Sequence, residues 1–268
     1  MNDAPIGIFD SGIGGLTVAA AILRALPDEQ VVYLGDTARV PYGPKSPETV
    51  VRYSRQIASW LLEQRVKAIV IACNTATAHA LSILQRECPV PVIGVVEPGA
   101  RAAVSATRNG RIGVIGTTGT INSGAYYRAI AALAPGATVT SGACPLFVPL
   151  VEEEGWVDHP ATRLIAETYL APLRDASVDT LVLGCTHYPL IASVIGEVVG
   201  REVMLVDSAA ETARALREVL ATHALQASAG GPARHHRFIA TDAPDTFRRI
   251  GQRFIGPALD DVETTVFA

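Results

Sequence analysis

The strongest constraint on the fold is a strand–helix rhythm that repeats along the chain. Short runs of Val, Ile and Leu are each followed by a longer segment with helical periodicity. Continuously apolar strands are typical of parallel sheets that helices cover on both faces. In the first half, we expect strands at 6–9, 31–34, 68–72 and 91–96, and helices at 16–26, 47–65 and 75–86. In the second half, we expect strands at 112–116, 137–142, 180–184 and 203–207, and helices at 120–133, 160–175 and 188–198.

The two halves are laid out alike, which indicates an internal duplication. Each half has a small polar loop after its first strand and a cysteine-bearing loop after a later strand. The expected fold class is therefore α/β, with two similar parallel-sheet domains that face each other across a cleft and are related by pseudo-two-fold symmetry. A chain of 268 residues has the length of two ordinary domains.

The C-terminal tail complicates a cut at the midpoint. We expect a helix at 209–222, a loop at 222–236, strands at 237–241 and 262–267, and a helix at 244–250. We predict that this tail packs on the first half. The expected first domain is then discontinuous, with residues 1–97 and 209–268, and the second domain has residues 98–208.

Composition excludes several classes of protein. The net charge is −4 and the arginines are scattered, so nucleic acid is not expected as the primary partner. No apolar run approaches the roughly 20 residues of a membrane span, and the first residues lack the layout of a secretion signal. We therefore expect a cytoplasmic protein that binds no membrane. No cysteine pair or histidine pair has the spacing of metal ligands, so no metal site is expected.

Lysine is rare in this chain, which limits the possible cofactors. The 22 basic residues include only Lys45 and Lys67. Lys45 lies in a PYGPKS turn, and Lys67 directly precedes an apolar strand. Pyridoxal phosphate needs a lysine for its Schiff base, and neither position suits that role. We therefore do not expect pyridoxal phosphate as a cofactor.

Two cysteines stand where an α/β protein binds its ligands. Cys73 follows the strand AIVIA, and Cys185 follows TLVLG. Ligands of open α/β sheets bind at the carboxyl ends of the strands. A helix start is expected after each cysteine, and its positive end favours a thiolate and binds carboxylates. The flanking residues can form hydrogen bonds: Asn74 and Thr75 in the first loop, Thr186 and His187 in the second.

Two thiols in equivalent loops of facing domains fit the inversion of a stereocentre. One thiolate removes the α-proton, and one thiol delivers a proton to the opposite face. Backbone N–H groups and hydroxyls of DSG, CNT, TTGT and CTH could hold the α-carboxylate. Asp10, after the first strand, could orient the amino group or help the proton of the thiol to move, and His187 could do the same on the other face.

Seven segments together resemble one enzyme family. They are IGIFDSGIGGLTV, YLGDTARVPYGPKS, IACNTATAHAL, PVIGVVEPGARAA, CPLFVPLVEEEG, LGCTHYPLI and LVDSA. They run from residue 6 to residue 209, about three quarters of the chain, in the order and spacing of bacterial glutamate racemases. The resemblance implies cofactor-independent interconversion of L- and D-glutamate, with D-glutamate supplied to peptidoglycan synthesis.

The resemblance also implies roles for individual residues. The paired acid–base residues would be Cys73 and Cys185, assisted by Asp10, Glu152 and His187. The substrate contacts would come from Asp10, Ser11, Tyr42, Gly43, Asn74, Thr75, Thr117, Thr118 and Thr186. The family uses neither pyridoxal phosphate nor metal, and the chain would pair into a homodimer. Because no long extension precedes the first strand, we do not expect activation by a peptidoglycan precursor.

Other activities remain open from the residues alone. Racemisation of aspartate or a hydantoin would keep both cysteines and change the pocket. A decarboxylase with one cysteine is less compatible with two thiols. A two-lobed α/β protein could also bind a small anion without chemistry, although paired cysteines have no evident purpose there.

Several residues also have structural interpretations. Cys88 and Cys144 are expected to be buried structural thiols. A disulfide between Cys73 and Cys185 is disfavoured in a reducing compartment. DSGIGG resembles a dinucleotide fingerprint, but Thr17 stands where its third glycine should be. Asp36 and Glu97 fit helix caps or salt links as well as functional roles.

Overall fold

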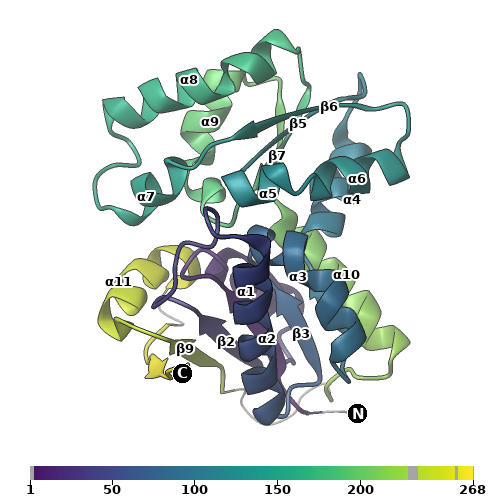
Figure 1. The fold of residues 1–268 in the computed structure, drawn as a ribbon, viewed down its shortest axis with the longest axis vertical. Coiled ribbons are helices and arrows are strands. Elements are labelled where there is room, and N and C mark those ends of the chain that lie inside the picture. The colour runs from purple at the N-terminus through teal and green to yellow at the C-terminus, as the bar shows by residue number, and fades with distance from the viewer. Residues whose placement is uncertain (1–2, 229–234, 257–258, 268) are drawn as a thin grey trace. The chain divides into compact units, whose positions relative to one another are not determined.

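The computed structural model describes residues 3–228, 235–256 and 259–267, and the chain divides into two compact units. The first unit comprises Met1–Val95 and Ala209–Ala268, and the second comprises Val96–Ser208. Each unit is built on its own parallel sheet (Figure 1). The protein is therefore an α/β protein with two parallel sheets.

The described strands of the first unit form one sheet in the order β10-β9-β2-β1-β3-β4. Their bounds are β1 Ile6–Asp10, β2 Val31–Gly35, β3 Ala68–Ile71, β4 Val92–Gly94, β9 Arg237–Ala240 and β10 Glu263–Thr264. The helices are α1 Leu16–Ala25, α2 Pro47–Glu63, α3 Asn74–Glu87, α10 Ser208–Thr222 and α11 Pro244–Ile255. Because β9 pairs in parallel with β2, the C-terminal residues belong to the same sheet as the N-terminal strand.

Two hydrophobic layers enclose the first sheet. One layer joins strand residues to α1, α10 and α11, through side chains such as Leu16, Leu216 and Phe247. The other layer joins strand residues to α2 and α3, through side chains such as Ile57 and Leu84. The central strands are buried on both faces, which explains why they are continuously apolar in sequence.

The second unit contains a smaller sheet in the order β6-β5-β7-β8. The strands are β5 Arg111–Gly116, β6 Thr138–Ala143, β7 Thr180–Gly184 and β8 Met204–Val206. The helices are α4 Val96–Ala106, α5 Thr118–Asn122, α6 Ala125–Leu133, α7 Phe147–Glu152, α8 Pro160–Asp175 and α9 Ala192–Val199, with a 3-10 turn, η1, at Tyr188–Ile191. All pairings in this sheet are parallel, as in the first.

Several element predictions were wrong in detail. The helix expected at 120–133 is two helices, because Gly124 has a φ of 65° between α5 and α6. The helix expected at 188–198 begins as the 3-10 turn η1. Strand 91–96 shortens to Val92–Gly94, and strand 262–267 to Glu263–Thr264.

Other differences are helices that were missed or too short. Helices α4 and α7 were not predicted. Helix α11 extends to Ile255, five residues beyond the predicted end at 250. The loop expected at 222–236 lies partly in residues 229–234, outside the described residues.

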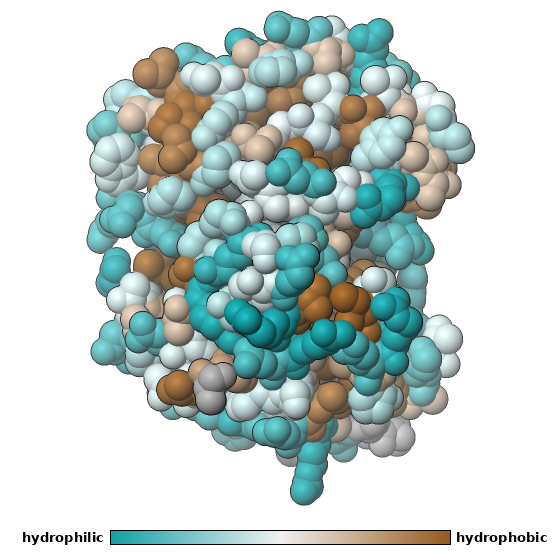
Figure 2. Space-filling view, in the orientation of Figure 1, coloured by the Kyte–Doolittle hydropathy of each residue, from teal (hydrophilic) through white to brown (hydrophobic). Residues whose placement is uncertain are grey.

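The surface carries its large apolar side chains in separate groups. Those exposed among the described residues include Leu146, Trp156, Leu164 and Val266. Figure 2 shows hydrophobic groups separated by hydrophilic side chains on the face in view. Scattered exposed apolar residues are ordinary for a folded protein. Within the described ranges, no helix has the length and apolar character needed to cross a bilayer.

Candidate active site

The carboxyl ends of three neighbouring strands meet in the first unit. β1 pairs with β2 and β3, with Asp10 opposite Gly35 and Phe9 opposite Ile71. Asp10 ends β1, and Asp36 and Cys73 follow β2 and β3 closely. The backbone connects them further, because Asp36 N–H donates to Asp10 O at 3.1 Å and Ala72 N–H donates to Phe9 O at 2.8 Å.

Cys73 lies at the N-terminus of a helix. It is the N-cap residue of α3, and Ala76 N–H donates to its sulfur at 3.4 Å. The thiol lies 3.6 Å from Ser11 Oγ, which accepts its hydrogen bond. The side chain is 6% exposed. The helix dipole and this N–H group stabilise negative charge on the sulfur, so the site favours a thiolate.

Asp10 is held in a tightly packed turn. It is fully buried, and its Oδ1 accepts a hydrogen bond from Gly12 N–H at 2.9 Å. A Cβ on Gly15 would lie 2.5 Å from Asp10 Cβ and 2.8 Å from the Tyr33 hydroxyl. Glycine at this position therefore lets the start of α1 pack directly against the carboxylate. Burial, followed by the charges of Asp10 and Cys73, raises the pKa of Tyr33, so its hydroxyl stays protonated and donates to Gly12 O at 3.0 Å.

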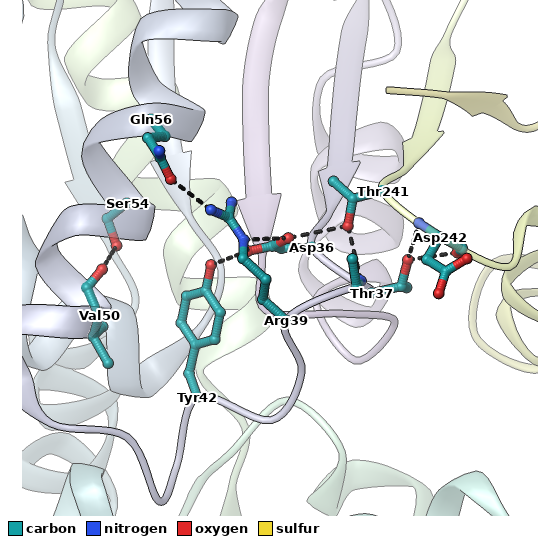
Figure 3. A network of polar contacts seen from close by, with 10 residues as sticks. Asp36, Thr37, Arg39, Tyr42, Val50, Ser54, Gln56, Thr241 and Asp242 are labelled. Carbon is teal, nitrogen blue, oxygen red and sulfur yellow. Dashed lines mark hydrogen bonds and ion pairs between the residues drawn. The ribbon is translucent and has the colours of Figure 1, made fainter. Parts of the chain in front are cut away.

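Tyr42 and Gly43 lie in the loop between β2 and α2, and both are buried. The Tyr42 hydroxyl donates to Asp36 Oδ2 (Figure 3). Burial and Asp36 raise the pKa of Tyr42, which keeps the phenol neutral. The hydroxyl of Tyr42 is therefore engaged within the protein. Asn74 and Thr75 are also buried, in the first turn of α3 directly after Cys73.

Cys185 lies beside a histidine and a carboxylate in the second unit. It follows β7, and His187 Nδ1 lies 3.8 Å from its sulfur. On the other side of the ring, His187 Nε2 lies 2.8 Å from Glu152 Oε1. Cys185 is 6% and His187 3% exposed, whereas 29% of the Glu152 side chain is exposed. The three groups form a chain along which a proton can move between the thiol and the protein surface.

The charge of His187 is set by burial and by its two neighbours, Cys185 and Glu152. Burial lowers its pKa, but the hydrogen bonds and charges of Cys185 and Glu152 outweigh burial and raise the pKa to about 10. The imidazole therefore holds a proton at neutral pH. A protonated His187 places a positive charge beside the sulfur of Cys185.

The two cysteines are thus supported in different ways. The expectation of a helix start after Cys185 was wrong, because the 3-10 turn η1 follows and α9 begins only at Ala192. A single 3-10 turn provides a weaker dipole than the 14-residue helix α3. His187 supplies at Cys185 the positive charge that α3 supplies at Cys73.

The remaining predicted substrate contacts of the second unit lie at the same end of its sheet as Cys185. Thr117 is the N-cap residue of α5, and its Oγ1 accepts a hydrogen bond from Thr120 N–H at 3.3 Å. Thr118 is exposed in the first turn, and Thr186 is buried between Cys185 and His187. β5 and β7 are adjacent, with Gly116 opposite Gly184. Thr117 directly follows Gly116, and Cys185 directly follows Gly184. Both loops therefore begin at the carboxyl ends of adjacent strands.

Comparison with known proteins gives the family. The family model for Asp/Glu/Hydantoin racemase matches residues 7–216. A protein from Geobacter metallireducens named glutamate racemase is 58% identical over 257 residues, which cover 96% of this chain and 94% of that protein. The chain belongs to the Asp/Glu/hydantoin racemase family. It is an amino-acid racemase, and therefore an isomerase.

Solved structures agree with this assignment to the racemases. A glutamate racemase isoform from Bacillus anthracis matches with a TM-score of 0.93 and 40% identity, over 100% of this chain and 98% of that one. The glutamate racemase from Francisella tularensis, solved in complex with D-glutamate, matches with a TM-score of 0.91 and 38% identity, over 99% and 98% of the two chains. The racemase therefore shares the fold of these enzymes along nearly its whole length.

The other candidate residues of the racemase have structural partners. All four cysteines are free thiols. Burial raises the pKa of Cys144 to about 12, and burial also raises the pKa of Cys88. Glu97 forms an ion pair with Arg101 at 2.7 Å on α4. Asp36 forms an ion pair with Arg39 at 2.7 Å. It also accepts a hydrogen bond from Tyr42, which the sequence did not indicate.

Metal-ligand side chains do not gather anywhere in the described ranges of the racemase. No group of three or more His, Cys, Asp or Glu side chains lies close enough to hold an ion there. The polar groups around Cys73 and Cys185 include hydroxyls, backbone N–H groups, the amide of Asn74, one histidine and two carboxylates. These groups suit hydrogen bonding to a zwitterionic ligand and movement of protons.

Proposed function

We propose that this racemase interconverts L- and D-glutamate without a cofactor, with Cys73 and Cys185 as its two acid–base groups. The substrate follows from the relatives named glutamate racemase, at 58% and 52% identity over nearly the whole chain. Asp10, Glu152 and His187 would assist the thiols.

One observation carries the mechanism. Each unit presents a buried cysteine just past a strand that has neighbours on both sides: Cys73 lies two residues past the end of β3, and Cys185 directly follows β7. Each of these cysteines has a group that stabilises its thiolate: the N-terminus of α3 for Cys73, and His187 for Cys185. A binding protein without chemistry would need neither group.

The reaction balances with one proton removed and one proton added. A thiolate takes the α-proton from one face of the substrate, which leaves a planar carbanion and a neutral thiol. The thiol on the opposite face gives its proton to the α-carbon and becomes the thiolate. In the reverse direction the two cysteines exchange roles. After each turnover, protons must return to the starting distribution, and the His187–Glu152 pair offers a route at Cys185.

The carboxylates of the substrate need hydrogen-bond donors where negative charge develops. Ser11, Asn74 and Thr75 would supply them beside Cys73, and Thr117, Thr118 and Thr186 beside Cys185. Tyr42 and Gly43 would contribute through the backbone of their loop. N–H groups at helix N-termini bind carboxylates well, and α3 and α5 both begin at these sites.

The wider arrangement is part of the proposal. The two units would act as two domains, 1–97 with 209–268 and 98–208, each of which contributes one of the two cysteines. Cys73 of the first domain and Cys185 of the second would act on the same substrate. The racemase would work as a homodimer in the cytoplasm, supply D-glutamate to peptidoglycan synthesis, and bind neither nucleic acid nor membrane.

The position of Lys67 supports a mechanism without pyridoxal phosphate. Lys67 precedes β3, at the opposite end of that strand from Cys73. Its ammonium group is 2.5 Å from Glu29, and both side chains are almost fully buried. The Lys67 side chain is thus engaged by Glu29 at the far end of β3 from Cys73, and it is not placed to form a Schiff base with a cofactor at that site.

Optical rotation tests the proposal directly. Purified protein should abolish the circular dichroism of L-glutamate and of D-glutamate with no cofactor added, and dialysis against a chelator should leave the rate unchanged. Aspartate and a hydantoin serve as alternative substrates. If aspartate racemises and glutamate does not, the assigned substrate is wrong. If no amino acid racemises and glutamate still binds, the binding-protein interpretation replaces the proposal.

A further inference from the structure

A network of polar side chains lies beside the Cys73 site and is separate from the groups proposed above to transfer protons. Its centre is Asp36, which is fully buried directly after β2. Three side chains donate to its carboxylate: Arg39, Tyr42 and Thr241 (Figure 3). A buried carboxylate is stable only when its oxygens are paired, so this network has a strong preference for one geometry.

The network fixes the loop of residues 36–46, which joins β2 to α2 and contains no helix or strand. Irregular segments lose backbone entropy when they are ordered, and contacts must offset that loss. Within the loop, Arg39 N–H donates to Asp36 O at 3.1 Å, and Lys45 N–H donates to Tyr42 O at 3.0 Å. The Arg39 guanidinium also donates to Gln56 of α2 at 2.5 Å. These bonds hold the loop between the sheet and a helix.

Thr241 connects this loop to the C-terminal part of the chain. It follows β9, 205 residues away from Asp36 in sequence, and is 7% exposed. Its hydroxyl donates to Asp36 Oδ1 at 3.0 Å and accepts from Ala38 N–H at 2.9 Å. One side chain therefore holds both the carboxylate and the backbone of the loop.

The neighbouring residues reinforce the same attachment. Thr241 N–H donates to Gly35 O at 3.1 Å. The Thr37 hydroxyl donates to Asp242 O at 2.6 Å and accepts from Asp242 N–H at 2.8 Å. These bonds extend the pairing of β2 with β9 into the loop. The loop that carries Tyr42 and Gly43 is thus anchored by residues that are distant from every other part of the Cys73 site in sequence.

The loop also lies against the turn that holds Asp10. A Cβ on Gly12 would lie 3.2 Å from Val40 Cγ2, so Val40 packs closely on that turn. Asp36 N–H donates to Asp10 O at 3.1 Å. A shift of the loop would therefore move Tyr42 and Gly43 relative to Asp10.

We propose that Thr241, acting through Asp36 and Ala38, is a positioning residue that holds the Tyr42–Gly43 backbone ready for the substrate. The inference rests on the proposed function, because it takes these two residues as substrate contacts. Thr241 touches neither substrate nor thiol. Its effect is preorganisation: the loop is ordered before the ligand arrives, so less of the binding free energy is spent on ordering it.

The test replaces Thr241 with Val, which keeps the shape of the side chain and removes the hydroxyl. Losing the bond to a buried carboxylate should raise KM for both enantiomers about tenfold, with kcat within about twofold of wild type. Thr241→Ser keeps the hydroxyl and should restore KM. Ser54→Ala is the matched control, because this buried hydroxyl beside the network donates only to Val50 O of its own helix (Figure 3).

Amide hydrogen exchange gives a second readout that needs no catalysis. In Thr241→Val, the amides of residues 37–40 and 42 should exchange about tenfold faster, with those of β1 and β3 unchanged. Unchanged exchange would overturn the inference, and so would faster exchange with unchanged KM. If the wild-type protein fails to racemise glutamate, the proposed function fails, and exchange alone still decides whether Thr241 holds the loop.

Discussion

Replacing Cys73 with Ser is expected to lower kcat for glutamate racemisation about 1,000-fold, and Cys185→Ser should do the same. A serine hydroxyl is a much weaker acid than a thiol, so it is not ionised at neutral pH by a helix N-terminus or by His187. Each variant still offers a side chain of similar shape, so KM should change much less than kcat. Circular dichroism with each enantiomer measures both constants.

The loss should be equally severe for either cysteine, because one proton must be removed and one delivered in every turnover. Proton NMR in heavy water follows the α-proton and separates removal from inversion. Cys88→Ser is the control, since this thiol is half-buried and lies outside both sites. A Cys73 or Cys185 variant with more than about a tenth of the wild-type kcat would contradict the two-thiol mechanism.

Most of the strands could be predicted from sequence because their burial is uniform. β1, β2, β3 and β7 are buried at every residue, so each is a continuous apolar run. Once the strands are predicted, their carboxyl ends are known, and Cys73 and Cys185 lie within two residues of such ends. The pattern alone therefore predicts that Cys73 and Cys185 lie at the carboxyl ends of strands.

The missed helices both contain residues that normally break helices. α4 includes Pro98 and Gly99, and α7 includes Pro149. Proline is tolerated in the first turn of a helix, where its missing N–H has no partner in any case. Gly99 is explained by packing, because a Cβ there would lie 3.1 Å from the Tyr126 hydroxyl. Such a requirement depends on a distant part of the chain and is invisible in the local pattern.

The contacts that organise each site could not be predicted from the local sequence pattern either. Glu152 bonds to His187 across 35 residues, and only the family resemblance suggested it. Thr241 bonds to Asp36 across 205 residues, and nothing in either segment indicates this. Local sequence predicts which residues can carry chemistry, whereas tertiary packing decides which groups surround them.

His187 is expected to make the stability of the second unit depend strongly on pH. Its pKa is about 10 in the folded protein, because bonds to Cys185 and Glu152 outweigh the effect of burial, whereas an unfolded histidine has a value of 6.5. Since the folded state binds this proton more tightly, the stabilisation is complete below pH 6.5 and is lost as the pH rises towards 10. The shift corresponds to a few kcal/mol, about 1.4 kcal/mol for each pH unit.

His187→Asn removes this group, so the melting temperature should fall about 5 to 10 °C at pH 6 and much less at pH 10. Thermal melts of both proteins at pH 6, 8 and 10 measure the difference. His223→Asn is the control, because this histidine is exposed at the end of α10 in the first unit. The comparison also bears on catalysis: a histidine that keeps its proton up to about pH 10 keeps a positive charge beside the sulfur of Cys185 across the physiological range. A deficit of the same size at all three pH values would mean that His187 is neutral in the folded protein, and the thiolate at Cys185 would then need another source of positive charge.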